Sequence, residues 1–439
     1  MKTYKKYKDS KIEWIGEIPT EWNVARLRYR GKSIIGITYK PDEVSDETNG
    51  TLVLRSSNVQ NGKLDFKDCV YVDKKIQESQ LTKEGDILVC ARNGSAHLVG
   101  KCAYIPKEWE NVSFGAFMSI VRTDLDKFLF YYFNSQVFKG QKGLFATSTI
   151  NQLTSNMLNN LDVPIPPTKD EQTAIANYLD KKTAEIDQLI ADKEQLVALC
   201  QEEKTTIINQ AVTKGITPNV KLKDSGIVWL GDIPEHWDIV PLKYLVEVKD
   251  GTHDSPKPVP KSEDSFPLIT SKDIKDNVLN FDNCNHITRE DFIKINARSN
   301  VTYNDIIMPM IGTVGGAVIV NSKIDFSIKN VALFKTSSKD SLVCSRYLKY
   351  FLDSKVIYNQ FEEESRGGVQ NFVALGMLRN IKVFSISESE QTEIVQHIEK
   401  ESARIDAKIA KAEKYISLLT EYRTALISEV VTGKIKVID

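Results

Sequence analysis

The stretch EQTAIANYLDKKTAEID at residues 171–187 recurs as EQTEIVQHIEKESARID at residues 390–406, at an offset of 219 residues. The chain has no proline or glycine from Glu171 to Lys214, and Gly215 and Pro218 follow. Acidic residues after Pro166 and Pro167 favour a helix N-terminus here. This pattern predicts a helix of roughly 44 residues, about 65 Å long. The second copy predicts another long helix, from Glu390 to Gly433.

Helices of this length need a partner that covers their apolar residues. Apolar residues recur in both at an alternating spacing of three and four, which is typical of a coiled coil. Lys204 and Arg423 are basic at the same position of the two seams and are expected to fix the register. The alternative is two amphipathic helices that each pack on their own module. The predicted helix-pairing seam comprises Leu179, Ile186, Ile190, Val197, Ile207, Ile398, Ile405, Ile409, Ile416, Leu419 and Leu426.

The duplication extends over the whole chain. KDSKIEWIGEIPTEW (8–22) returns as KDSGIVWLGDIPEHW (223–237), and VTKGI (212–216) returns as VTGKI (431–435). In the middle of the chain VTKGI is followed by KDSGI. Joining the C-terminus, which carries VTGKI, to the N-terminus, which carries KDSKI, would recreate this order. The sequence therefore predicts two homologous modules of about 215 residues, a pseudo-two-fold internal repeat and antiparallel long helices. Trp14, Trp22, Trp229 and Trp237, with Pro19 and Pro234, are expected to clip each module onto the ends of these helices.

The predicted fold class is mixed α/β, with two homologous globular domains separated by two long antiparallel coiled-coil helices. LVLRSSNV (52–59), DILVCA (86–91) and FMSIVR (117–122) read as strands. Pro309 predicts an edge or bulged strand at 305–311, and the aromatic stretches 128–138 and 347–357 predict amphipathic helices. The predicted boundaries are a first globular domain at 1–168, a long helix at 169–215, a linker and second globular domain at 216–387, a long helix at 388–434, and a tail at 435–439.

Composition places the protein among ordinary globular chains. The 439 residues are 41% hydrophobic and 27% charged, and the net charge of −1 indicates no polyanionic partner by itself. Residues 1–40 hold ten Lys or Arg against four acids, so a basic face is compatible with a neutral total. The six cysteines show no CxxC pattern and are expected to be reduced thiols in the cytoplasm. No stretch predicts a signal peptide or a membrane span.

Motifs of catalysis are missing from the sequence. The five histidines, at positions 97, 236, 253, 286 and 397, lack metal-ligand spacing, and no metal site is expected. No P-loop, GxGxxG, GxSxG or Asn-Pro-Pro-aromatic motif occurs. A chain of this size without such motifs is predicted to be a recognition or scaffold protein rather than an enzyme.

With these motifs in hand, the chain resembles the specificity subunit of type I restriction–modification systems. The resemblance rests on KDSKIEWIGEIPTEW, on VPIPPTKDEQ (163–172) with the helix that follows, on VTKGI, and on the second copy of each. It covers essentially the full chain, although VFSISESEQ (383–391) lacks the prolines of the first copy.

The resemblance implies that each globular domain is a target recognition domain that reads one half of an asymmetric, bipartite site on double-stranded DNA. It implies that the helices set the spacer and dock two modification subunits, which bind S-adenosylmethionine. Restriction/translocase subunits that use ATP and Mg²⁺ are the other implied partners. The chain itself is expected to catalyse nothing and to hold no cofactor. A coiled-coil adaptor for two protein partners without DNA is the alternative; a self-sufficient nuclease or methyltransferase is disfavoured because its motifs are missing.

Base edges in the major groove are read by Arg, Lys, Asn, Gln, Ser or Thr side chains. Residues of these types stand in loops where the two copies diverge, although a plain surface loop would look the same. The candidate DNA-binding residues, which include one acid, are Arg55, Ser56, Asn58, Arg92, Asn93, Lys142, Thr147, Ser148, Asn151, Lys272, Asp273, Arg366, Gln370 and Asn371.

Overall fold

The computed structural model describes residues 2–145, 151–275, 278–310, 316–364 and 373–438. Contacts divide the chain into a first unit, residues 1–194 with 413–439, and a second unit, residues 195–412. Each unit contains strands, short helices and part of both long helices, which confirms the mixed α/β class. The border between the units falls within the long helices, whereas the predicted domain boundaries follow the helix ends.

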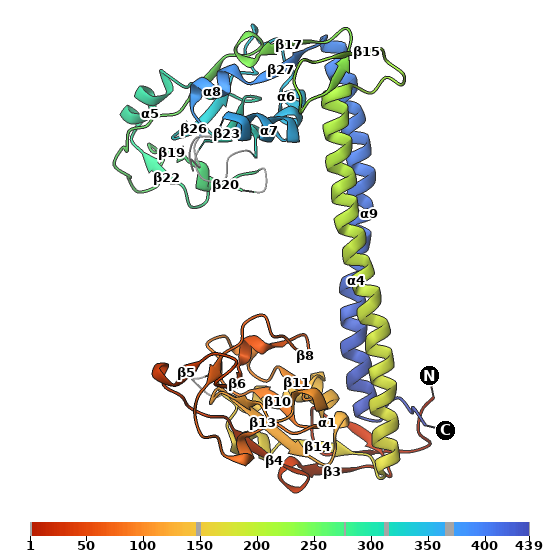
Figure 1. Ribbon diagram of the computed structural model, residues 1–439. Coiled ribbons are helices and arrows are strands. Elements are labelled where there is room, and N and C mark those ends of the chain that lie inside the picture. The colour runs from red at the N-terminus through yellow and green to blue at the C-terminus, as the bar shows by residue number, and fades with distance from the viewer. Residues whose placement is uncertain (1, 146–150, 276–277, 311–315, 365–372, 439) are drawn as a thin grey trace. The chain divides into compact units, whose positions relative to one another are not determined.

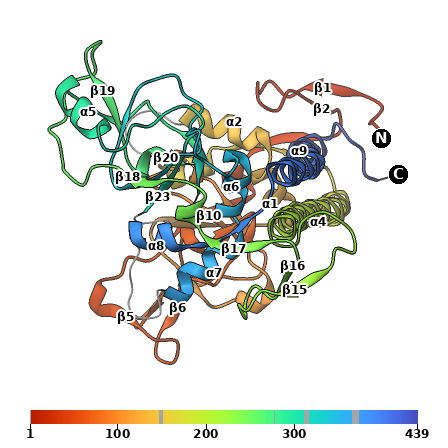
Figure 2. The same cartoon turned by 90° about the horizontal axis from the view of Figure 1, so that it is seen from above.

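Two long helices lie side by side (Figures 1 and 2), α4 at Lys169–Lys214 and α9 at Glu388–Val431. They contain 46 and 44 residues, or about 65–70 Å at 1.5 Å per residue. The prediction of both helices is confirmed. Gly215 and Gly433 follow them with φ angles of +70° and +71°, the left-handed conformation that ends many helices.

The residues of the predicted seam lie on the side of each long helix that is covered by other parts of the protein. All eleven of its residues are buried or half-buried. In the first unit, Leu179, Ile186 and Leu426 belong to one core, against which the partly buried Ile190 and Leu419 pack. Burial of this apolar stripe is the main reason why helices of this length are stable.

Two ion pairs at equivalent positions connect the long helices. In the first unit, Arg423 Nε donates to Asp187 Oδ1 at 2.7 Å. In the second unit, Lys204 Nζ donates to both carboxylate oxygens of Asp406 at 2.8 Å. The two basic residues and the two aspartates are each 219 positions apart, so the repeat places the same ion pair in both units. This arrangement supports the expectation that Lys204 and Arg423 fix the register.

The first unit contains two four-stranded sheets and several short ribbons. One sheet is antiparallel, with its strands in the spatial order β11 Cys102–Tyr104, β10 Ile87–Cys90, β13 Met118–Thr123 and β4 Gly31–Ile35. The other has the order β12 Ser113–Phe114, β6 Thr51–Leu54, β9 Tyr71–Val72 and β5 Val44–Ser45, with β12 parallel to β6. The ribbons are β1 Tyr7–Asp9 with β2 Glu17–Pro19, β3 Asn23–Arg26 with β14 Asp162–Ile165, and β7 Val59–Gln60 with β8 Lys63–Leu64.

The second unit repeats this plan. Its larger sheet has the order β18 Val248–Asp250, β26 Val331–Phe334, β23 Ile306–Pro309 and β24 Val318–Ile319. The other is β22 Asn285–Ile287, β19 Phe266–Ile269 and β25 Ser327–Ile328, again with one parallel pair, β19 with β25. The ribbons are β15 Leu222–Asp224 with β16 Asp232–Pro234, β17 Asp238–Pro241 with β27 Lys382–Ser385, and β20 Ile274–Lys275 with β21 Val278–Leu279; a helix, α5, spans Arg289–Asn296.

The edge position predicted for the strand with Pro309 is wrong. β23 lies inside its sheet, between β24 and β26. Pro309 is the last residue of β23, and β24 pairs only with Ile306 and Ile307. The proline therefore needs no N–H for pairing on that side.

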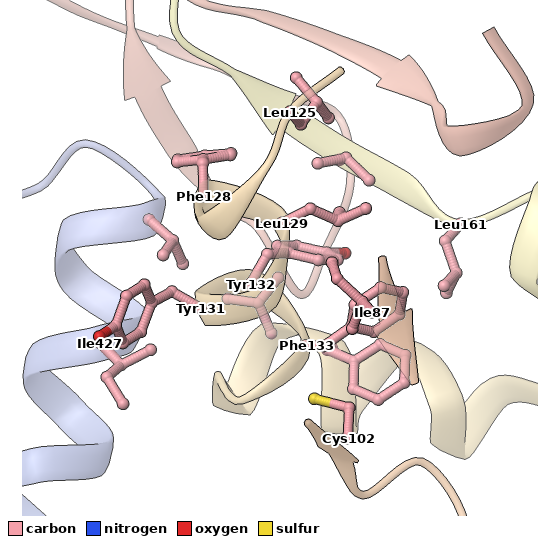
Figure 3. Close-up of a cluster of buried hydrophobic side chains, with 14 of the residues drawn as sticks. Ile87, Cys102, Leu125, Phe128, Leu129, Tyr131, Tyr132, Phe133, Leu161 and Ile427 are labelled. Atoms are coloured by element: carbon pink, nitrogen blue, oxygen red, sulfur yellow. The ribbon is translucent and has the colours of Figure 1, made fainter. Parts of the chain in front are cut away.

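The aromatic stretches each form two short helices rather than one. The first stretch forms α1 Lys127–Phe133, whose side chains Figure 3 shows in the core, and then α2 Gln136–Phe145. Ser135 ends α1 by donating to Tyr132 O at 2.6 Å, and its Oγ accepts from Phe138 N at 3.3 Å. Serine side chains compete with helical hydrogen bonds in this way. The second unit has the same break, between α6 Ser345–Leu352 and α7 Lys355–Glu364; the remaining helices are α3 Ser155–Asn159 and α8 Leu375–Asn380.

Two of the four tryptophans that recur in the repeat attach the modules to the long helices. Trp22 and Trp237 are fully buried, and their indole N–H groups donate to Oε1 of Glu171 at 3.1 Å and of Glu390 at 2.9 Å. These glutamates lie in the first turns of α4 and α9. Pro19 lies against Gly433, just after α9, and Trp14 covers Gly140 in α2. For Trp14, Trp229 and Pro234, contact with the long helices stays a prediction.

The buried thiol of Cys102 makes the stability of the first unit sensitive to alkaline pH. It lies among the aromatic rings of the core (Figure 3), and burial raises the pKa of the thiol from 9.0 to about 12. Its stabilising contribution is therefore complete below pH 9 and is lost as the pH rises towards 12. Cys102→Ala removes this dependence. Between pH 8 and pH 10 we expect the wild type to lose about 1 kcal/mol more unfolding free energy than the variant, measured by urea titration; equal losses would contradict the assignment.

Candidate nucleic-acid interface

A cleft of about 900 Å³ opens in the first unit where several strands and loops meet. Five of the predicted DNA-binding residues line it together, although they lie up to 96 positions apart in the chain. The lining residues are Ile37, Thr38, Tyr39, Arg55, Ser56, Ser57, Asp68, Arg92, Asn93, Gly94, Gly115, Ala116, Phe117, Met118 and Asn151.

Arg92 is the exposed cation of this cleft. Its guanidinium lies over the ring of Phe117, 5.3 Å from the centroid, and the Phe117 side chain is itself 59% exposed. The N–H groups of Ala91 and Arg92 both donate to Phe117 O at 2.9 Å. Among the described residues, no side chain forms a hydrogen bond or an ion pair with the Arg92 guanidinium, and Arg92 is exposed. Sequence reasoning missed Phe117, because no periodic pattern in a sequence predicts an exposed aromatic ring beside a cation.

Arg55 is more constrained than Arg92. Its Nη2 atom forms an ion pair with Asp68 Oδ2 at 2.7 Å, and its buried Nε has no partner among the described residues. The Arg55 side chain is 33% exposed and that of Asp68 is 65% exposed. An ion pair this exposed contributes at most about 1 kcal/mol. It is therefore weak enough for a phosphate or base to compete with Asp68.

The two asparagine side chains of the cleft are already engaged within the protein. Asn93 Nδ2 donates to Ser56 Oγ at 3.1 Å, and Asn93 Oδ1 accepts from Ser95 N at 3.0 Å. Asn151 Nδ2 donates to Gly94 O at 2.9 Å. These amides hold the loops of the cleft together, so their geometry favours a positioning role.

Three other predicted residues have structural roles that argue against base contact. Asn58 is fully buried; it caps the Arg55 N–H at 2.8 Å and donates to two carbonyls at 2.9 Å. Asp273, its equivalent in the second unit, is buried and accepts from Thr270 N at 2.9 Å. Lys142 donates to Val99 O at 2.6 Å, and burial lowers its pKa. Sequence reasoning chose these residues by polarity, which does not distinguish a loop cap from a base reader. Thr147, Ser148, Arg366, Gln370 and Asn371 lie outside the described residues.

The second unit carries different side chains on the same scaffold. Thr252 forms a parallel bridge with Lys329, as Ile37 does with Gly115 in the first unit. Next to it, the His253 ring lies between Asp250 Oδ2, at 2.9 Å, and Asn330 Oδ1, at 3.0 Å. Asp250 is buried and also pairs with Arg298.

The predicted Lys272 is exposed in the neighbouring 3-10 turn Ser271–Asp273. Sequence reasoning missed His253, Arg298 and Lys329. His253 falls in the segment 251–266, where the two copies diverge, and that is its only signal in the sequence. The two units thus share their strands and differ in the polar groups that the strands present.

Neither a metal centre nor a membrane segment is found in the described part of the chain. No three His, Cys, Asp or Glu residues gather closely enough there to bind a metal ion. All six cysteines are free thiols. Within the same residues, no helix is both long enough and apolar enough to cross a bilayer.

Comparison with known proteins gives one consistent family. Residues 29–198 match the type I restriction modification DNA specificity domain. The chain is 29% identical over 251 residues to the EcoKI specificity subunit of Escherichia coli K12, covering 55% of this chain and 52% of the relative. It is 22% identical over 412 residues to the EcoBI specificity subunit of Escherichia coli, covering 91% and 83%. The chain thus spans about half the length of the EcoKI subunit.

Solved structures show the same fold at low sequence identity. A chain from a study of complex assembly and conformational transition of the type I R-M system superposes with a TM-score of 0.68 at 14% identity, covering 95% of this chain and 99% of that chain. The HsdS subunit from Thermoanaerobacter tengcongensis gives a TM-score of 0.54 at 14% identity, with coverage of 95% and 98%. The chain is thus similar to the specificity subunits of type I restriction–modification systems in its family match and its relatives, and it shares the fold of the two solved structures.

Proposed function

We propose that this chain is the DNA sequence-recognition subunit of a type I restriction–modification complex. Each unit reads one half of a bipartite target on double-stranded DNA. The observation that carries the proposal is the first-unit cleft, where Arg92 is exposed and has no hydrogen-bond or ion-pair partner for its guanidinium among the described residues. Its backbone is hydrogen-bonded, and polar loop residues lie beside it. Arginine donors of this kind suit the edges of bases and the phosphates around them.

The proposed target is asymmetric. The larger sheets of both units have the same strand order, but the bridge between Ile37 and Gly115 in the first unit is matched in the second by the bridge between Thr252 and Lys329, beside which His253 lies. Because different side chains favour different base edges, two identical half-sites are not expected. The long helices set the number of unread base pairs between the half-sites.

The proposed partners supply all the chemistry. Two modification subunits, which bind S-adenosylmethionine, dock on the helices, and restriction/translocase subunits that use ATP and Mg²⁺ complete the complex. This chain is proposed to be non-catalytic, to hold no cofactor and to act in the cytoplasm, where the DNA it reads is located. A coiled-coil adaptor for two protein partners would also need the long helices, but the cleft would have no role in it.

Methylation mapping tests the proposal. The chain is co-expressed with its modification subunit in a host without other methyltransferases, and modified bases are mapped over the genome. We expect one asymmetric motif with two specified halves and a fixed unspecified spacer. The control omits this chain and is expected to give no motif. A motif that persists without the chain would contradict the proposed function, and a complex that assembles but modifies no motif would favour the adaptor.

A further inference from the structure

Arg92 and Gln152 face each other in the first unit, 60 positions apart in the chain. They are the partners of an isolated antiparallel bridge, and both are exposed. Residues directly opposite one another in an antiparallel pair project from the same face, with Cβ atoms about 4.5–5.5 Å apart. The bridge therefore projects an arginine and a glutamine side chain from neighbouring positions on one face.

The backbone on both sides of this pair is fixed. Leu153 N donates to Ala91 O at 2.7 Å, and Asn93 N donates to Asn151 O at 3.3 Å. The Asn151 side chain adds its bond to Gly94 O. Because hydrogen bonds flank the bridge in both directions, little conformational entropy remains to be lost in the backbone when the two side chains bind a ligand.

The side chains themselves keep their hydrogen-bonding capacity. Within the described residues, neither the Arg92 guanidinium nor the Gln152 amide has a hydrogen-bond or ion-pair partner. The neighbouring amides of Asn93 and Asn151 are both used inside the protein. The Phe117 ring contacts one face of the guanidinium. The N–H donors at the edge of the guanidinium remain free, and their planar arrangement can bind two acceptors at once.

We propose, on the basis of the function proposed above, that Arg92 and Gln152 are the base-reading pair of the first unit. Arg92 donates to O6 and N7 of a guanine, and Gln152 pairs with N6 and N7 of an adenine in the adjacent base pair; these are the favoured contacts of the two side chains in the major groove. Opposed residues across a bridge have Cβ atoms about 4.5–5.5 Å apart, near enough for two long side chains to reach neighbouring bases about 3.4 Å apart. Phe117 is a positioning residue that holds the guanidinium.

Methylation mapping of variants in the complex with the modification subunit tests this assignment. Arg92→Ala is expected to relax one guanine of one half-site to any base, with a loss of discrimination of about 5- to 150-fold. Arg92→Lys keeps the charge but not the planar fork, and is expected to relax the same position. Gln152→Ala should relax the neighbouring position, at an adenine. The other half-site and the spacer should stay as in the wild type.

Controls separate this inference from the proposed function. Lys75→Ala removes an exposed cation of the same unit that does not line the cleft, and its motif should equal that of the wild type. Phe117→Ala should relax the Arg92 position, and Phe117→Tyr should restore it. If the wild type yields a bipartite motif that Arg92→Ala and Arg92→Lys both leave unchanged, the base-reading assignment is wrong while the proposed function stands. If the wild type yields no motif dependent on this chain, the proposed function fails first.

Discussion

Insertion of one heptad into each long helix is expected to move methylation to sites whose half-sites lie about three base pairs further apart. Seven residues that copy one seam period are added after Thr205 in α4 and after Arg404 in α9, which are neighbours of the ion pairs that join the helices in the second unit. A heptad keeps the apolar stripe on the same side of each helix. It adds about 10 Å, close to three base pairs at 3.4 Å each.

Methylation mapping gives the result directly. The bases specified in each half-site should not change, because neither globular part is altered, and modification at the original spacing should disappear. The control replaces one existing heptad of each helix by the copied sequence, without a change of length, and should keep the original spacer. Insertions of three residues shift the stripe relative to the partner helix and should abolish activity. Full activity of the heptad variant at the original spacing would show that the helices do not set the spacer.

Removal of the Asp305 carboxylate is expected to destabilise the second unit by about 3–5 kcal/mol, the usual effect of leaving a buried charge without its partner. The Asp305 side chain is fully buried, and its partner Lys335 is 9% exposed. Lys335 Nζ also donates to Asn300 O at 2.7 Å, and Asp305 accepts from Thr302 N at 2.8 Å. Asp305→Ala thus removes the carboxylate that both the Lys335 ammonium group and the Thr302 N–H contact. Urea unfolding of the variant measures the loss.

Two further variants show whether the buried charge is the cause. Asp305→Ala combined with Lys335→Met removes both charges and should recover most of the lost stability, since replacing a whole buried ion pair by apolar groups is often neutral. The equivalent pair in the first unit is Asp86 with Arg122, and Arg122 is 24% exposed. Asp86→Ala leaves a cation that water can reach, so a smaller loss of about 1–3 kcal/mol is expected. Equal losses in both units would contradict the explanation by burial.

The sequence by itself determined the features that repeat with a period. The doubled motifs, the two long helices and the apolar seam follow from spacing alone, because a helix of 46 residues without proline or glycine has no other way to bury a stripe of this period. For Lys204 and Arg423, the sequence predicts that they fix the register of the two helices, but it does not predict their ion pairs. Their aspartate partners follow once the direction of the helices is known.

Only the tertiary structure decided which polar loop residues act together. Asn58 and Arg92 are equally plausible as readers in the sequence, yet Asn58 is buried as a loop cap and Arg92 is exposed on Phe117. Gln152 becomes Arg92's neighbour through a single bridge between segments 60 residues apart. Periodicity reports the local face of a helix or strand, whereas contacts between distant loops depend on the path of the whole chain. For that reason the fold and five of the cleft residues could be predicted from the sequence, whereas the proximity of Arg92 to Phe117 and Gln152 could not.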